Sequence, residues 1–148
     1  MKTIVETLSV LSSELSYSNL RILSEICKGI FRLGGKVTGL NISRYTDKGG
    51  SYRNIQRFFL VNINWLRIRM LLFSSFLYSV GEIFIMAADE CTEGKAGKFT
   101  FGIGYFYSSI SQKVIRSISF LHIAFLSVNN HDSYSVAVKQ ITKKEENQ

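Results

Sequence analysis

An aspartate at the end of an apolar run is the residue of this sequence best placed to do chemistry. Residues 83–88 (IFIMAA) carry no charge, and Asp89 and Glu90 follow them directly. Six uncharged residues rich in Ile and Phe predict a short strand buried on both faces. A carboxylate at the end of such a strand loses hydration unless water, a partner or a metal ion compensates. Asp89 is therefore either a metal-binding acid or a strand-end acid that faces solvent.

The segment after Asp89 is expected to be a flexible, basic loop. Glycine tolerates backbone conformations that other residues avoid, so a glycine-rich segment can approach a ligand closely. Residues 90–104 contain four glycines and two lysines: Gly94, Gly97, Gly102, Gly104, Lys95 and Lys98. A strand that delivers an acid to such a loop is a candidate site.

The charge of the chain predicts a polyanionic partner. The 148 residues carry a formal net charge of +7, with a pI near 9.5. Residues 36–69 contain seven basic residues and one acid, so this stretch supplies +6 of the total. A concentrated basic segment favours nucleic acid as the partner, ahead of a membrane surface.

Cysteine and histidine usage indicates a reducing compartment and no zinc site. Cys27 and Cys91 are isolated, and His122 and His131 lie far from both in sequence. Two cysteines without metal-ligand spacing are typical of a cytoplasmic protein. The first 16 residues are amphipathic and lack the apolar block of a signal peptide.

The first part of the chain is expected to be helical. Thr3 and Glu6 form a capping-box pattern, and apolar residues then recur at helical spacing as far as Leu15. Residues 16–19 offer a new N-cap for a second helix that Gly34 and Gly35 end. Cys27 lies in the apolar stripe of that second helix, which favours a core position.

A later helix resembles the second helix of a helix-turn-helix. Residues 46–50 form a turn by composition, and Ser51 is a suitable N-cap. Four apolar residues are expected to face inward: Ile55, Phe58, Phe59 and Ile63. Arg53, Gln56 and Arg57 share the opposite side. We expect Arg53 and Arg57 to contact a DNA groove or phosphates, and Arg44 and Lys48 to contact phosphates.

The apolar stretch that follows has two interpretations. Residues 65–78 predict a buried helix that ends near Ser79, before the strand at residues 83–88. A single membrane span near residues 70–88, with Arg67 and Arg69 beside it, is the alternative. Gly81 and Glu82 interrupt the run, which favours the helix and strand.

The last part of the chain is expected to contain strands. Residues 118–128 predict a long strand, residues 129–132 a turn, and residues 134–141 a second arm. The predicted fold class is therefore α+β, with a helical, basic DNA-binding region at residues 1–79 and strands at residues 80–148.

Two long strings of this sequence resemble DDE transposases of bacterial insertion sequences. The first is SRYTDKGGSYRNIQRFF, residues 43–59. The second begins with AADE at residues 87–90 and continues with AGK at 96–98 and FGIGYFYSS at 101–109. The resemblance extends over about residues 20–141, with the parts in the same order.

The resemblance implies a helical DNA-binding region ahead of a catalytic domain similar to ribonuclease H. Such domains hold two Mg²⁺ ions with three carboxylates, and Asp89 matches the first of these as a catalytic and metal-binding residue. The predicted strands at 118–128 and 134–141 would be the second and third strands. Two metal ions clamp the attacking and leaving oxygens of the phosphodiester.

The sequence departs from the family in lacking the other two carboxylates. The acids after Asp89 are Glu90, Glu93, Asp132, Glu145 and Glu146, and none follows a fourth strand. We interpret the chain as the N-terminal part of a transposase, with the first three antiparallel strands of a truncated RNase H-like domain. It is expected to bind DNA without cleaving it, and to hold Mg²⁺ only weakly.

Other roles remain open at this point. The chain could supply Asp89 to a catalytic domain completed by the missing half, or inhibit the full-length transposase as a regulatory partner or homo-oligomer. The single-span membrane protein is the alternative from a different class. The strand with Asp89 is also expected to keep one unpaired edge, which would make residues 80–148 poorly soluble when expressed alone.

Overall fold

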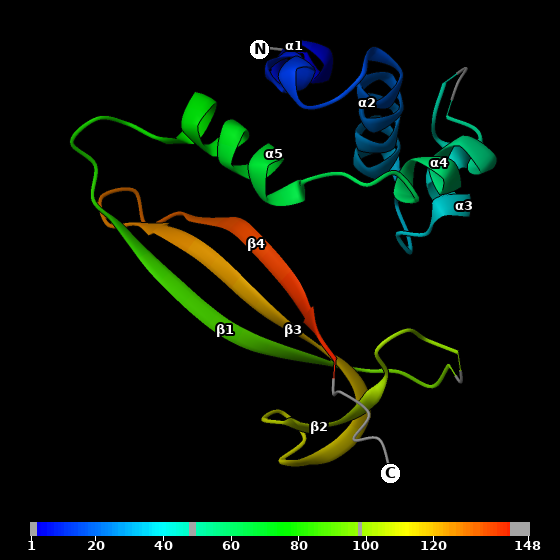
Figure 1. Cartoon of the computed structure of the whole chain (residues 1–148), viewed down its shortest axis with the longest axis vertical. Helices are drawn as coiled ribbons and strands as arrows, with labels where there is room; N and C mark the ends of the chain where they lie inside the picture. Colours follow the sequence, from blue (N-terminus) through cyan, green and yellow to red (C-terminus); the bar gives the residue numbers. More distant parts are fainter. Residues whose placement is uncertain (1–2, 48–49, 98, 143–148) are drawn as a thin grey trace. The chain divides into compact units, whose positions relative to one another are not determined.

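The chain folds into helices followed by an antiparallel sheet, which confirms the α+β class (Figure 1). The computed structural model describes residues 3–47, 50–97 and 99–142. The chain divides into two compact units, Met1–Leu77 and Tyr78–Gln148. We call them the helical unit and the sheet unit.

The helical unit begins with the capped helices that the sequence predicts. Helix α1 (Ile4–Leu8) has the Thr3–Glu6 capping box, and a 3₁₀-helix, η1 (Ser9–Ser13), follows it. Helix α2 (Tyr17–Arg32) starts at Ser16, whose hydroxyl accepts the Asn19 N–H at 3.3 Å. These caps satisfy backbone donors that a helix end otherwise leaves unpaired.

Helices α2, α3 (Gly39–Arg44) and α4 (Tyr52–Phe59) pack against one another. Their shared core consists of four buried residues: Ile26, Ile42, Ile55 and Phe58. Gly29 lets α2 approach α3 closely, because a Cβ there would lie 2.8 Å from Ile42 Cγ2. This core fixes the side of α4 that remains exposed.

A second core joins the start of the helical unit to its end. Helix α5 (Trp65–Leu72) contributes Ile68, which packs with Leu8, Leu11 and Leu15. Cys27 packs against this core, and burial raises the pKa of its thiol, as expected for a structural cysteine.

The apolar stretch at residues 70–88 is divided between two kinds of structure. A π-helical turn, η2 (Phe73–Leu77), ends the helix, and strand β1 begins at Phe84. None of the helices in the described part of the chain is both long and apolar enough to cross a membrane.

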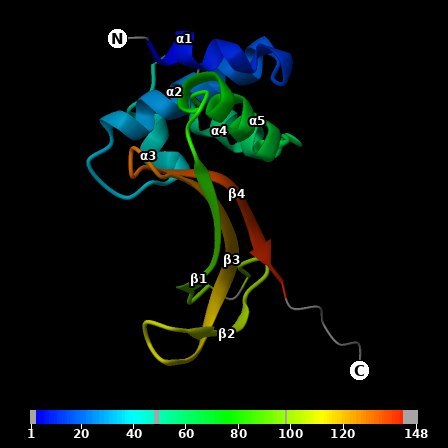
Figure 2. The ribbon, with the colours of Figure 1, turned by 90° about the vertical axis from the view of Figure 1, so that its left-hand side faces the viewer.

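The sheet unit has four antiparallel strands: β1 (Phe84–Gly94), β2 (Gly104–Ser108), β3 (Lys113–Ser127) and β4 (Ser133–Ile141). The long strand β3 lies between β1 and β4 (Figures 1 and 2). Ser117 pairs with Gly94 on one edge and Gly104 on the other. Strand β2 therefore lies along the same edge of β3 as β4.

Three expectations about the first strand and the segment that follows it were wrong. Strand β1 continues past Asp89 to Gly94, because residues 90–94 pair with residues 117–121 of β3. The predicted loop at 90–104 also contributes the first residue of an additional strand, β2. Most of β1 is exposed rather than buried on both faces, and both cores of buried apolar residues found in the described part lie in the helical unit.

Strand β1 leaves an apolar edge open. It pairs with β3 on one side, and no strand within the described ranges pairs with its other side. Ile85 is 57% exposed there. An unpaired apolar edge is a template for association with another chain.

Placing a lysine on this edge is expected to reduce aggregation of the full chain. Ile85→Lys should raise the concentration at which light scattering begins, because an edge charge opposes strand addition. Val80→Lys is the matched control, since Val80 is 94% exposed and precedes β1. Equal aggregation of the two variants would contradict a role for the β1 edge.

Candidate nucleic-acid interface

The two sides of α4 have opposite character. Ile55 and Phe58 are 0% and 1% exposed and anchor the helix in its core. Arg53, Gln56 and Arg57 are exposed on the other side, as the spacing predicts. Helix α4 contains no acidic residue. Its outer side therefore offers two cations and an amide to a ligand, without a competing carboxylate from the same helix.

The position of Phe59 corrects the sequence-based expectation. Phe59 is 59% exposed, whereas it was expected to face inward. Phe58 fills the core position, and the Phe59 ring meets the Phe58 ring edge-on, with 5.6 Å between ring centroids. Leu60, the C-cap of α4, is 85% exposed. Apolar side chains thus border the basic side of the helix.

These apolar residues and the basic ones line one shallow hollow. Its volume is about 550 Å³. The residues around it are Gly39, Tyr52, Arg53, Ile55, Gln56, Arg57, Phe59 and Leu60. The combination of cations, an amide and exposed rings suits a partner with phosphates and bases.

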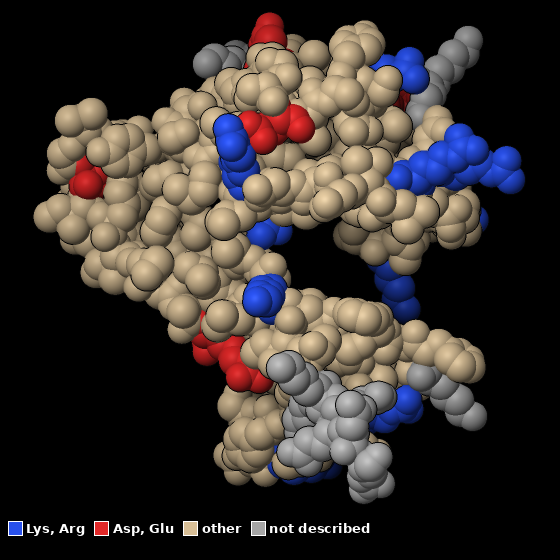
Figure 3. All heavy atoms as spheres, viewed as in Figure 1, with Lys and Arg blue, Asp and Glu red and all other residues tan. Residues whose placement is uncertain are grey.

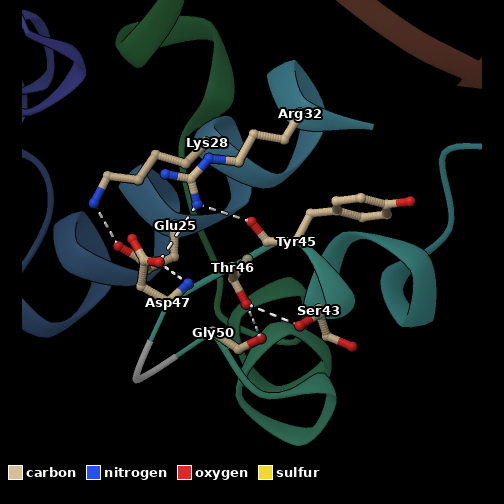
Figure 4. A network of polar contacts seen from close by, with 8 residues as sticks. All are labelled: Glu25, Lys28, Arg32, Ser43, Tyr45, Thr46, Asp47 and Gly50. Carbon is tan, nitrogen blue, oxygen red and sulfur yellow. Dashed lines mark hydrogen bonds and ion pairs between the residues drawn. The ribbon is translucent and has the colours of Figure 1, made fainter. Parts of the chain in front are cut away.

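The turn between α3 and α4 is tied to α2 by a buried carboxylate (Figure 4). Glu25 of α2 is 6% exposed and accepts the backbone N–H of Asp47 at 2.9 Å. The Lys28 ammonium donates to the other Glu25 oxygen at 2.7 Å. This carboxylate therefore anchors the turn to the helix behind it.

Two further residues hold the same turn (Figure 4). The Arg32 guanidinium donates to the Tyr45 carbonyl at 3.2 Å and meets the Asp47 carboxylate at 3.4 Å. The Thr46 hydroxyl lies within hydrogen-bond distance of the Ser43 and Gly50 carbonyls, at 3.1 and 2.8 Å. Residues 45–47 are thus held beside α2, and Thr46 contacts Gly50, which precedes the N-cap Ser51 of α4.

Sequence reasoning missed Glu25. Its position between Ser24 and Ile26 in α2 gives no signal of a partner 22 residues away. A buried acid in a helix is unusual unless it is paired. That rule could have raised the question of a partner but could not have identified the Asp47 N–H.

Removing the Glu25 carboxylate is expected to destabilise the helical unit. Glu25→Ala should lower the free energy of unfolding by about 1–3 kcal/mol, because the Asp47 N–H loses its acceptor. Chemical denaturation followed by circular dichroism measures this. Glu25→Gln keeps an acceptor oxygen and should cost less. An alanine variant as stable as the wild type would contradict the anchoring role.

Of the two other residues predicted to contact phosphates, the structure describes Arg44 but not Lys48. Arg44 is exposed at the end of α3, and its guanidinium donates to Asn41 Oδ1 at 3.3 Å. Lys48 lies outside the described residues. On the face drawn in Figure 3, Lys and Arg side chains project from the part of the helical unit that contains α3 and α4.

Asp89 lies at the middle of β1, on an exposed surface. Its carboxylate accepts the Glu90 N–H at 2.8 Å, and the residue pairs across the strands with His122. Neighbouring side chains of a strand point to opposite faces of the sheet. Glu90 accordingly bonds elsewhere, accepting the Ser119 hydroxyl at 2.6 Å. Asp89 and Glu90 do not converge on one point.

The described residues contain no metal-binding group of three or more His, Cys, Asp or Glu side chains. The residues around Asp89 therefore do not fit a two-metal centre, which needs several carboxylates that converge on the metal ions.

No family model, curated protein or solved structure matches the chain.

Proposed function

We propose that the helical unit binds duplex DNA through the exposed side of α4. One observation carries this proposal. The helix turns Arg53, Gln56 and Arg57 to solvent while Ile55 and Phe58 hold it in the core. An α-helix with its side chains is about 10–12 Å across, so it fits the major groove of B-DNA, which is about 12 Å wide.

The chemistry of these side chains assigns their roles. Arginine pairs with phosphates or with the O6 and N7 atoms of guanine, and glutamine can pair with adenine. Gln56 is therefore the candidate for base recognition, with Arg53 and Arg57 on bases or phosphates. Arg44 and Lys48 would add phosphate contacts from α3 and the turn.

We further infer that the chain is related to the DDE transposases of bacterial insertion sequences, which act in DNA transposition. The resemblance of residues 43–59 and 87–109 supports this inference. The antiparallel succession of β1, β3 and β4, with Asp89 on β1, is compatible with the start of an RNase H-like domain. Free Cys27 and Cys91 fit a reducing, cytoplasmic location.

Catalysis is not part of the proposed function of this chain alone. Asp89 lacks converging carboxylates in the described structure, so no step through Mg²⁺ is assigned to it. A regulatory role is the second candidate, and the open edge of β1 favours it. That edge could pair with a full-length transposase or a second copy of the chain and so inhibit transposition.

One experiment separates DNA binding from DNA cleavage. The full chain is incubated with a labelled duplex and Mg²⁺, and binding and strand cleavage are measured in the same samples. We expect a retarded complex and intact strands, with the Asp89→Asn variant behaving identically. Cleavage that disappears in Asp89→Asn would instead assign catalysis to this chain. Failure to bind at low salt would contradict the whole proposal.

A further inference from the structure

The helical unit contains a mostly apolar cavity between α1–η1 and α2. Its volume is about 390 Å³. Val5, Leu8 and Ser12 line it from α1 and η1. Leu20 and Ser24 line it from α2, one helical turn apart. The cavity is within the size range of small-molecule sites, about 300–1,000 Å³, and near its lower end.

An unpartnered hydroxyl lies among these lining residues. Ser24 is 5% exposed, and its Oγ has no hydrogen-bond partner in the described structure. A buried hydroxyl without a partner is destabilising, and most native structures avoid it. Less than 1 Å² of this Oγ is accessible, so the Ser24 side chain must rotate about χ1 toward the cavity for a ligand oxygen to supply the missing acceptor.

A cation without a partner lies next to this hydroxyl. Arg21 lines the cavity, is exposed, and makes no hydrogen bond or ion pair to any residue that the structure describes. Glu25 and Lys28 also line the cavity, but they pair with each other at 2.7 Å. The uncompensated charge at the cavity is therefore positive. Residues three apart on a helix are neighbours, so one anion can reach both Arg21 and Ser24.

We propose that this cavity binds a small amphipathic carboxylic acid. The apolar chain packs against Val5, Leu8 and Leu20. The carboxylate accepts hydrogen bonds from the Arg21 guanidinium and the Ser24 hydroxyl. The cavity is separate from the proposed DNA-binding side of α4, because none of its lining residues belongs to α3 or α4. Binding of a carboxylic acid in this cavity is thus a function separate from DNA binding.

Calorimetric titration of the full chain with octanoate tests this site. Saturable binding is expected in the wild type. It should be lost in Ser12→Trp, which places a large ring at the cavity lining. Ser13→Trp is the matched control, because Ser13 is also exposed but does not line the cavity. No saturable binding, or equal binding by both tryptophan variants, would overturn the proposal.

Two more variants test the carboxylate contacts. Arg21→Gln and Ser24→Ala should each weaken octanoate binding by roughly tenfold or more, as expected for hydrogen bonds to a charged group. Octanol, with the same chain and no charge, should bind more weakly to the wild type and lose little in Arg21→Gln. Ser24→Ala should also melt no lower than the wild type, which excludes misfolding. Equal affinity of the wild type for octanoate and octanol would overturn the anion site.

Discussion

Replacing Phe58 with alanine is expected to destabilise the helical unit more than any other single change considered. Phe58 is 1% exposed and packs with Ile26, Ile42 and Ile55 where three helices meet. Truncating a buried Phe leaves a cavity and costs about 3–5 kcal/mol. Total stabilities are about 5–15 kcal/mol, so the variant loses a large share. Urea denaturation followed by circular dichroism measures the loss.

The neighbouring phenylalanine provides the control for this experiment. Phe59 has the same side chain in the same helix but is 59% exposed. Phe59→Ala should change the free energy of unfolding by less than about 1 kcal/mol, because little apolar surface returns to water. If Phe59→Ala were as destabilising as Phe58→Ala, the assigned orientation of α4 would be wrong.

Removing both arginines of α4 is expected to weaken DNA binding strongly while leaving the fold intact. Each arginine on a phosphate contributes about 0.9 to the slope of log affinity against log salt concentration. Arg53→Ala with Arg57→Ala should therefore reduce the slope by about 1.8 if both contact phosphates. Fluorescence anisotropy of a labelled duplex over a salt series measures this. Both side chains are exposed, so stability should change little.

A double variant in the sheet unit controls for net charge. Lys113→Ala with Lys139→Ala removes the same two charges from exposed positions on β3 and β4. Its salt slope should match that of the wild type, because those residues are not on α4. Equal slope losses in the two double variants would mean that binding follows net charge, without a defined interface on α4.

The elements that the sequence predicted well depend on local chemistry. Thr3, Ser16 and Ser51 are N-caps in the structure, and each acts on residues within the first helical turn. The inward position of Ile55 follows from the helical period alone. Such signals involve neighbours in sequence, so a single sequence contains them.

The elements that the sequence predicted poorly depend on distant partners. Strand β1 runs past Asp89 because Thr92 and its neighbours pair with residues of β3 more than 20 positions later. Glu25 is buried and accepts a hydrogen bond from the backbone N–H of Asp47, which lies 22 residues later in the sequence. Periodicity also could not choose between Phe58 and Phe59, since both positions border the same stripe. The packing of three helices made that choice.

The salt dependence of wild-type DNA affinity tests the central claim most directly. If Arg44, Lys48, Arg53 and Arg57 each neutralise one phosphate, the slope of log affinity against log salt should be between about −3 and −4. The measurement needs only the full chain, a labelled duplex and a range of salt concentrations. A slope in that range supports a basic DNA-binding side on the helical unit. A slope near zero, or no binding at low salt, would contradict it.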